Sequence, residues 1–229
     1  MTTHLITGAG SGIGSVLARR LLDRGDVVVA MARDAGRAKQ IAEDLPGASV
    51  IVGDLAQPGR LSWALSKQQL PDRIDSLVHV AGVVDLGDVA DLPAALWEQQ
   101  LAVNLIAPAE LTRLLLPVLR VSQGQVVFVN SGAGLRANAG WSAYAASKHG
   151  LKALADALRA EEALHGVRVT SIYPGRTATP MQERVHQQEG QAYDAERYAT
   201  PEAVVATILT ALDLPRDAQI TDLTVRPGR

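Results

Sequence analysis

The sequence predicts an α/β fold, in which one doubly wound parallel sheet lies between two layers of helices. Seven short apolar runs recur along the 229 residues, and each is nearly continuous, which is typical of parallel strands covered on both faces. Amphipathic stretches rich in alanine and leucine separate the runs, as in a series of βαβ units. No linker, repeat or change of composition divides the chain, so we expect one domain over residues 1–229.

The predicted elements follow one another in a regular order. The strands are expected at His4–Thr7, Val27–Met31, Ser49–Val52, Ser76–Val80, Gln125–Asn130, Arg168–Tyr173 and Ile220–Val225. The helices are expected at Ser15–Arg24, Ala94–Arg120, Ser142–His165 and Pro201–Leu212. Pro108 and Pro117 interrupt the second helix and predict that it is kinked or frayed. Thr200 is placed to cap the last helix, with Pro201 at its first position.

The composition excludes several classes of protein. Lys and Arg number 22 and Asp and Glu 24, so we expect neither nucleic acid nor an acidic membrane as a partner, because both need a basic face. There are no cysteines, which excludes disulfides and thiolate sites, and we predict no metal. The longest apolar run, Val27–Ala32, has six residues, whereas a spanning helix needs about 20. The first strand reaches Gly8 before a signal peptide could fit. We therefore expect a soluble cytoplasmic protein.

Three glycines follow the first strand and open the first helix. Gly8, Gly12 and Gly14 have the spacing G-x-x-x-G-x-G. Such glycines permit a tight turn, let the backbone approach a pyrophosphate, and let the helix pack close to the strand. The helix N-terminus offers free N–H groups to the phosphates. A tight turn without a ligand is the alternative, but the position in the first βα turn favours a dinucleotide site.

The ends of the second and third strands bear on the choice of cofactor. Arg33 follows the second strand, where many NAD enzymes place an acid for the ribose 2′-hydroxyl. If Ala32 takes the place of that acid, no carboxylate repels a 2′-phosphate and Arg33 can pair with it, which favours NADP(H) over NAD(H). The alternatives are a surface Arg33 and an Asp34 that caps a helix or does the work of the acid. Asp54 could accept a hydrogen bond from an adenine amino group, or could cap the next helix.

Three polar residues form a candidate catalytic set. The i, i+4 spacing of Tyr144 and Lys148 puts both on one face of a helix. A nearby ammonium lowers the pKa of a tyrosine from about 10, which suits Tyr144 to proton transfer between a carbonyl and an alcohol. Ser131 ends the fifth strand at the edge where ligands bind, and its hydroxyl can donate to a substrate oxygen. The alternatives are a surface tyrosine and lysine, and a serine that caps a turn. No G-x-S-x-G elbow surrounds Ser131.

Six motifs occur in an order that is more specific than any one of them. They are Thr7–Gly14, His79–Gly82, Asn104, Ser131, Tyr144–Lys148 and Pro174–Thr179. Together they resemble the short-chain dehydrogenase/reductase family over essentially the whole chain, which implies a Rossmann-like sheet of about seven strands with helices on both faces. The resemblance implies that Tyr144 is the general acid and base, Lys148 holds the nicotinamide ribose and lowers the pKa of Tyr144, and Ser131 orients the carbonyl. It implies that Asn104 holds a water that links Lys148 to solvent, although an asparagine there could simply bend its helix.

The resemblance also implies a cofactor site, a reaction and an assembly. The expected cofactor contacts are Gly8, Ser11, Gly12, Ile13, Gly14, Arg33, Asp54, Leu55, Ala81, Gly82, Tyr144, Lys148, Pro174, Gly175, Thr177 and Thr179. We expect an NADP(H)-dependent oxidoreductase that exchanges hydride between the nicotinamide and a carbonyl or secondary alcohol of a small molecule. We expect a homodimer or homotetramer. The alternative is a catalytically silent nucleotide-sensing or scaffold protein of the same fold, which the intact Ser-Tyr-Lys set disfavours.

Three departures from the family pattern are visible. Val80 stands where the N-A-G motif of the family has its asparagine, and His79 beside it is expected to be a strand-end residue. The segment Pro180–Thr200 is short and polar for a substrate lid, which predicts a small or open pocket. The C-terminus lacks the frequent D-G-G ending, which bears on the tetramer arrangement.

Overall fold

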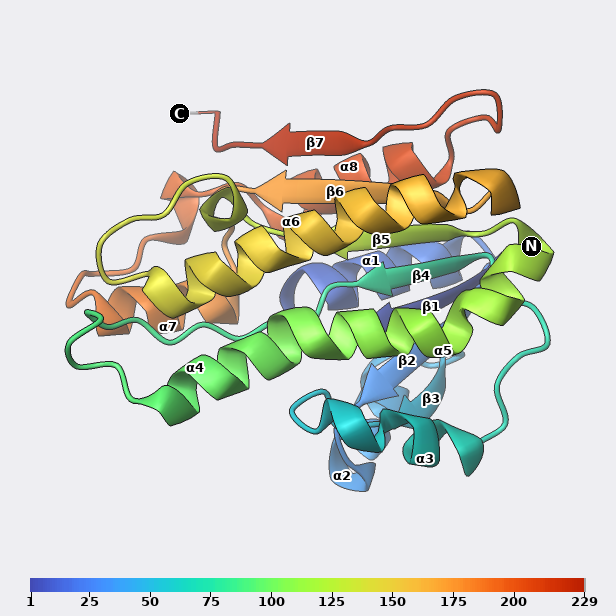
Figure 1. Ribbon diagram of the computed structural model, residues 1–229, viewed down its shortest axis with the longest axis horizontal. Coiled ribbons are helices and arrows are strands. Elements are labelled where there is room, and N and C mark those ends of the chain that lie inside the picture. Colours follow the sequence, from blue (N-terminus) through green and yellow to red (C-terminus); the bar gives the residue numbers. More distant parts are fainter. Residues whose placement is uncertain (229) are drawn as a thin grey trace.

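The computed structural model describes residues 1–228 and has the predicted α/β fold. Seven strands form one sheet in the order β3-β2-β1-β4-β5-β6-β7, and each pairs in parallel with its neighbours; in Figure 1 the arrowheads of β4, β6 and β7 point to the left. The strands are β1 Thr3–Thr7, β2 Val27–Ala32, β3 Ser49–Val52, β4 Ser76–His79, β5 Gln125–Val129, β6 Arg168–Pro174 and β7 Asp222–Val225. Each predicted strand exists, with ends that differ from the prediction by at most a few residues.

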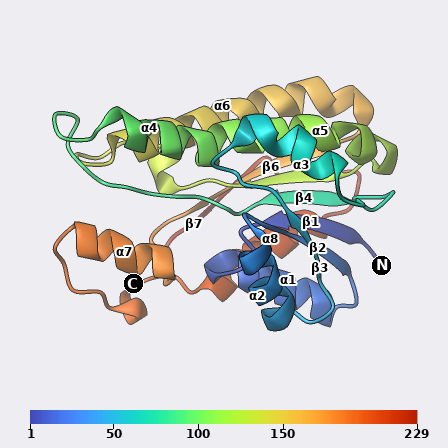
Figure 2. The same ribbon diagram turned by 90° about the horizontal axis from the view of Figure 1, so that it is seen from below.

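Helices cover both faces of the sheet, as Figure 2 shows edge-on. One layer holds α3 (Leu61–Ser66), α4 (Ala94–Leu101), α5 (Ala107–Ser122) and α6 (Ser142–Glu162). The other holds α1 (Gly12–Asp23), α2 (Ala35–Asp44) and α8 (Pro201–Leu212). Successive strand residues face opposite layers, so Leu5 belongs to the core under α5 and α6 while Ile6 belongs to the core under α1 and α8. This double covering is why the strands are apolar at nearly every position.

The long helix between β4 and β5 is interrupted, as predicted, at Pro108. Residues 102–106 form a turn of π-helix between α4 and α5. Pro108 has no N–H to donate to the carbonyl of Asn104, four residues earlier, which explains why the regular ladder fails there. The interruption expected at Pro117 is absent, because Pro117 lies inside a continuous α5. Among residues 1–228, the helix from 94 to 122 is long and apolar enough to cross a membrane by length and composition alone, but leucines such as Leu111 and Leu115 belong to the core of the sheet.

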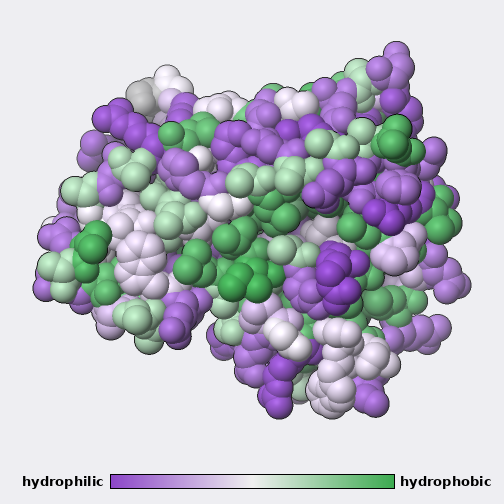
Figure 3. Space-filling view, in the orientation of Figure 1, coloured by the Kyte–Doolittle hydropathy of each residue, from purple (hydrophilic) through white to green (hydrophobic). Residues whose placement is uncertain are grey.

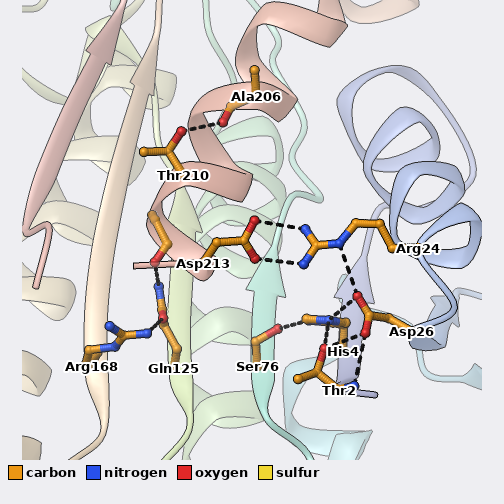
Figure 4. Close-up of polar contacts among 11 residues, drawn as sticks. Thr2, His4, Arg24, Asp26, Ser76, Gln125, Arg168, Ala206, Thr210 and Asp213 are labelled. Carbon is orange, nitrogen blue, oxygen red and sulfur yellow. Dashed lines mark hydrogen bonds and ion pairs between the residues drawn. The ribbon is translucent and has the colours of Figure 1, made fainter. Parts of the chain in front are cut away.

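The amino edge of the sheet is held by a polar network (Figure 4). The ring of His4 lies 2.7 Å from Ser76 Oγ and 2.8 Å from Thr2 Oγ1. Arg24, just after α1, donates to both carboxylate oxygens of Asp213, just after α8, at 3.0 and 2.8 Å. These contacts tie β1, β4, α1 and α8 together at the edge opposite the strand ends where the predicted site lies.

Candidate active site

The carboxyl edge of the sheet opens into a cleft of about 780 Å³. Its walls come from the β1–α1 turn, the ends of β4, β5 and β6, the start of α6, and α7 (Pro180–Gln188). The predicted cofactor and catalytic residues that line it are Gly8, Ser11, Gly12, Ile13, Arg33, Ala81, Gly82, Ser131, Tyr144, Lys148, Pro174, Gly175, Thr177 and Thr179. Gly14, Asp54, Leu55 and Asn104 do not line it. Segments far apart in the sequence therefore converge on one site.

The glycine turn is shaped for a ligand at the N-terminus of α1. Gly8 has φ +74°, and a Cβ atom there would lie 2.7 Å from the backbone nitrogen of Ala81. A Cβ atom on Gly14 would lie 2.1 Å from the carbonyl oxygen of Gly8, so this glycine, although outside the cleft, lets α1 pack against the end of β1. Ser11 precedes α1 and makes no side-chain hydrogen bond to its first turn. The first N–H groups of α1 are thus left for an anion such as a pyrophosphate.

Arg33 and Asp34 have different roles beside this turn. The Arg33 side chain lines the cleft and is 76% exposed, with Nε 3.0 Å from an Asp34 carboxylate oxygen. The other carboxylate oxygen of Asp34 accepts from the backbone N–H of Arg37 at 2.7 Å, so Asp34 caps α2. That hydrogen bond and the neighbouring Arg33 hold the pKa of Asp34 below its ordinary value. Of the alternatives for Asp34, helix capping is the one that the geometry shows.

Asp54 is engaged within its own turn. Its carboxylate accepts from the backbone N–H of Ala56 at 2.9 Å and from the side chain of Gln57 at 3.0 Å. The adjacent Leu55 packs against the core under α3 and α5. Asp54 caps no helix, because the short helix that follows, Pro58–Arg60, has Gln57 at its N-cap. The capping alternative is therefore not met, and an adenine contact of Asp54 or Leu55 stays a prediction.

Tyr144, Lys148 and Ser131 line the same cleft. Tyr144 and Lys148 lie one turn apart on α6, with Lys148 Nζ 5.8 Å from the centroid of the Tyr144 ring. Lys148 is 3% exposed, and its Nζ donates to the carbonyl of Val129 at the end of β5. Ser131 Oγ accepts from the backbone N–H of Ala133 at 3.1 Å, which leaves the hydroxyl proton free to donate. The predicted convergence of a phenol, an ammonium and a hydroxyl is present.

Burial sets the protonation of this set. The pKa of Tyr144 is raised by burial, and a hydrogen bond with the Ser131 side chain opposes part of that rise. Burial lowers the pKa of Lys148 to about 8. The expectation that Lys148 lowers the pKa of Tyr144 is therefore not met in the protein alone, because loss of water around the phenol dominates. The raised pKa keeps the phenol protonated near neutral pH.

Asn104 lies in the π-helical turn and is hydrogen-bonded to the loop that follows β4. Its Oδ1 accepts from the backbone N–H of Val83 at 2.9 Å, and its Nδ2 donates to the carbonyl of Val83 at 2.8 Å and to Ser147 Oγ at 3.0 Å. A Cβ atom on Gly82 would lie 3.3 Å from Asn104 Oδ1 and 3.8 Å from Lys148 Nζ, so the amide sits close behind the lysine. The bound water stays a prediction.

His79 ends β4 as a buried structural residue. Its ring stacks on Phe128 with centroids 5.0 Å apart, and its Nε2 lies 2.9 Å from Thr112 Oγ1. Burial lowers the pKa of His79 to about 3. It does not line the cleft, which agrees with the expected strand-end role.

A family model described as short chain dehydrogenase matches residues 2–190. The chain belongs to the short-chain dehydrogenase/reductase family. It is 33% identical over 225 residues to "Dehydrogenase/reductase SDR family member 7B" of Bos taurus, covering 91% of this chain and 69% of the relative. It is 31% identical over 183 residues to L-fucose dehydrogenase of Mus musculus, covering 79% of this chain and 67% of that one.

Solved structures of the family share the fold. The crystal structure of a short-chain dehydrogenase/reductase family oxidoreductase from Burkholderia thailandensis matches with TM-score 0.85 and 32% identity, over 99% of this chain and 92% of that chain. A putative NAD(P)-dependent gluconate 5-dehydrogenase from Beutenbergia cavernae, with bound NADP, matches with TM-score 0.84 and 29% identity over 99% and 96%. The protein is thus an oxidoreductase of the short-chain type with a Rossmann-like sheet.

Sequence reasoning missed Asn130, whose side chain is hydrogen-bonded to Ser131 and to the turn of α6 that carries Lys148. Its Oδ1 accepts from the backbone N–H of Ser131 at 2.8 Å, and its Nδ2 donates to the carbonyl of Lys148 at 3.1 Å. One buried amide thereby joins the end of β5 to the lysine turn of α6. An asparagine at the end of an otherwise apolar strand, next to the serine, is the signal that could have found it.

The segment Pro180–Thr200 forms one wall of the cleft of this dehydrogenase. Its helix α7 places Met181 and Val185 along the cleft. The Arg176 guanidinium donates two hydrogen bonds to the carboxylate of Glu189, which follows α7. His186 Nε2 lies 2.6 Å from the hydroxyl of Tyr198. These contacts hold the end of α7 to Arg176 and to Tyr198. Of the two predicted alternatives, a small or an open pocket, the small pocket is not met, since the cleft has about 780 Å³.

Proposed function

We propose that this protein is an NADP(H)-dependent oxidoreductase that exchanges hydride with a carbonyl or secondary alcohol of a small molecule, with Tyr144 as general acid and base. The observation that carries the proposal is the convergence of Tyr144, Lys148 and Ser131 in one cleft with the glycine turn. The nicotinamide cofactor, when bound, supplies or accepts the hydride. Tyr144 donates its proton to the carbonyl oxygen in reduction, and Ser131 donates a hydrogen bond to the same oxygen.

The remaining polar groups position this chemistry. Lys148 is free to hold ribose hydroxyls through N–H groups that its bond to Val129 does not use. Pro174, Gly175, Thr177 and Thr179 follow β6 on the cleft wall, and we assign them to the nicotinamide carboxamide and the diphosphate. Asn104 fixes the loop that carries Gly82 and Val83 behind the lysine.

Replacing Tyr144 with phenylalanine tests the mechanism. We expect NADPH oxidation with a panel of ketones and aldehydes to fall by about 10²–10⁴-fold, the usual contribution of a positioned acid or base, with NADPH affinity retained. Tyr193→Phe is the matched control, because Tyr193 does not line the cleft. An active Tyr144→Phe enzyme would refute the assigned role. NADPH binding without turnover of any carbonyl by the wild type would favour the silent sensor instead.

NADP(H) is the preferred cofactor in this proposal, with NAD(H) second. The cationic Arg33 side chain lines the cleft after β2, and the neighbouring Asp34 is committed to capping α2. We expect Arg33→Gln to weaken NADPH binding about tenfold, because a charge-assisted pair is lost, and to leave NADH binding unchanged. Arg60→Gln, outside the cleft, is the control. Equal losses for the two cofactors in a fluorescence titration would contradict the preference.

We also propose a homodimer or homotetramer in the cytoplasm that acts on small molecules and binds neither nucleic acid nor membrane. Apolar side chains gather at the centre of the face formed by α4, α5 and α6 in Figure 3, where Ile106 is 49% exposed. Such a patch suits burial against a second copy. Light scattering that gave the 24.2 kDa monomer mass would contradict the assembly.

A further inference from the structure

The charges on the cleft wall are all of one sign. Among the residues that the structure describes, five arginines and Lys148 line the cleft, and no Asp or Glu does. The arginines are Arg33, Arg136, Arg176, Arg184 and Arg226. The chain as a whole has more acidic than basic residues, 24 against 22, so this wall departs from the average surface. A concave site lined by one sign of charge focuses its field and concentrates ligands of the opposite sign.

Two of these arginines already have carboxylate partners. Arg33 lies 3.0 Å from Asp34, and Arg176 makes a two-pronged contact with Glu189. The other three, Arg136, Arg184 and Arg226, form no ion pair within residues 1–228. Each is exposed while lining the cleft, which places all three at its mouth.

The Arg226 side chain lies beside the predicted catalytic serine. It follows β7, and a Cβ atom on Gly132 would lie 2.5 Å from its Nη1, so the guanidinium rests directly on the residue after Ser131. A Cβ atom on Gly175 would lie 3.4 Å from its Cδ. The side chain thus crosses the ends of β5 and β6 beside the catalytic serine. The segment after β7 thus brings this cation to the cleft.

The Arg226 side chain approaches Gly175, which is assigned above to the cofactor, but it lies away from the turn and the arginine expected to bind the adenosine phosphates. The glycine turn and Arg33 follow β1 and β2, whereas Arg226 lies over the ends of β5 and β6. In the sheet order, β4 separates these two pairs of strands. The arginine therefore belongs to the half of the cleft beside Ser131, where the carbonyl of a substrate is expected, rather than to the half beside the adenosine turn.

We propose that the substrate carries an oxyanion, a carboxylate or a phosphate, in addition to its carbonyl or alcohol group, and that Arg226 binds it with Arg136 and Arg184 at the mouth. A planar guanidinium donates two parallel hydrogen bonds to either group. The oxyanion also neutralises arginines that form no ion pair within residues 1–228. This inference rests on the proposed function, since it names the substrate class of that same cleft.

Matched ketones test the inference by kinetics. Wild type, Arg226→Gln and the control Arg197→Gln, an exposed arginine outside the cleft, are assayed with NADPH. The substrates are levulinate, its methyl ester and methyl propyl ketone, and then dihydroxyacetone phosphate against dihydroxyacetone. We expect the wild type to prefer the anionic member of one set at least tenfold in kcat/KM. We expect Arg226→Gln to lose that preference mainly through KM, because the arginine holds a group that does not react.

A preference for levulinate within its set indicates a carboxylate substrate, and a preference for dihydroxyacetone phosphate over dihydroxyacetone indicates a phosphate substrate. Equal kcat/KM for anionic and neutral members in the wild type overturns the inference, and so does a preference that survives in Arg226→Gln. Arg226→Lys, which keeps the charge but loses the planar fork, should retain part of the preference.

A binding measurement separates this inference from the proposed function. Isothermal titration of levulinate and of dihydroxyacetone phosphate into the NADPH-loaded protein needs no turnover. Binding that disappears in Arg226→Gln, with no ketone reduced by any variant, leaves the oxyanion site standing and refutes the oxidoreductase proposal. Reduction of neutral ketones without binding of levulinate or dihydroxyacetone phosphate would support the oxidoreductase proposal and refute the oxyanion site. Thermal melting of each variant checks that it is folded.

Discussion

Gly14→Ala adds one methyl group where α1 lies closest to β1, and its effect follows from the geometry of that contact. The new Cβ atom would lie 2.1 Å from the carbonyl oxygen of Gly8 and 3.1 Å from Cα of Ala9. Real Cβ atoms essentially never approach a heavy atom closer than 3.0 Å, so the helix must retreat by about 1 Å. Both partners are backbone atoms, and no change of rotamer relieves the contact.

The expected change in the free energy of unfolding is the difference between two effects. Alanine in place of glycine inside a helix ordinarily adds up to about 1 kcal/mol of stability. Overpacking costs about 1–3 kcal/mol and occasionally more, and the retreat of α1 also separates Leu17 and Leu21 from the core that they share with Ile6. We expect a net loss of about 2 kcal/mol in the free energy of unfolding. The same movement displaces the N–H groups of α1, so NADPH affinity should fall at least about tenfold.

Urea denaturation followed by circular dichroism measures the first effect, and a fluorescence titration with NADPH measures the second. Gly59→Ala is the control, because no atom lies within 4 Å of a Cβ atom built there, and we expect it to be neutral or slightly stabilising. If Gly14→Ala equalled Gly59→Ala in both measurements, close packing of α1 on β1 would not be what shapes the turn.

Three further predictions concern buried polar groups. The folded pKa of His79 is about 3, below its ordinary 6.5, so its contribution to stability is complete above pH 6.5 and is lost as the pH falls towards 3. The free energy of unfolding should decrease by up to about 1.4 kcal/mol per pH unit in that window, and His79→Gln should flatten the decrease. Asn104→Leu removes the partners of the Val83 N–H and carbonyl, and should cost about 2 kcal/mol or more in urea denaturation. Because burial lowers the pKa of Lys148 to about 8, the activity that depends on its ammonium should decline above pH 8, and a pH profile without that decline would argue against the role.

The strands could be predicted from the sequence because both faces of the sheet are covered, which leaves each strand as a nearly continuous apolar run. No bounds were predicted for the helices α2, α3 and α7, because their sequences show no comparable apolar pattern. In α2 only Ile41 is buried, and α3 is six residues long. Some strand ends differ from the prediction where the chain turns into the cleft. The fifth strand was predicted to end at Asn130, whereas β5 ends one residue earlier, although the N–H of Asn130 still donates to the carbonyl of Ile172.

The candidate site likewise has a part that could be predicted from the sequence and a part that could not. Residues within local motifs, such as the glycine turn and the Tyr144 to Lys148 spacing, were predictable because their chemistry needs a fixed separation along the chain. The arginines that line the cleft were not predictable, because Arg136 and Arg226 are brought to one cleft only by the order of the strands, and a single arginine carries no local signal. The direction of the Tyr144 pKa also depends on burial, which the helical spacing does not reveal.

The departure at Val80 is tolerated because another residue holds the chain after β4. Thr7 Oγ1, at the end of β1, accepts from the backbone N–H groups of both Val80 and Ala81, at 3.1 and 3.2 Å. The turn that brings Ala81 and Gly82 to the cleft is therefore fixed by a buried hydroxyl and needs no amide at position 80. Val80 instead packs against the apolar cluster of α1 and α8. The loss of a polar side chain at this point is offset by backbone anchoring on one side and apolar packing on the other, so the cleft keeps its shape.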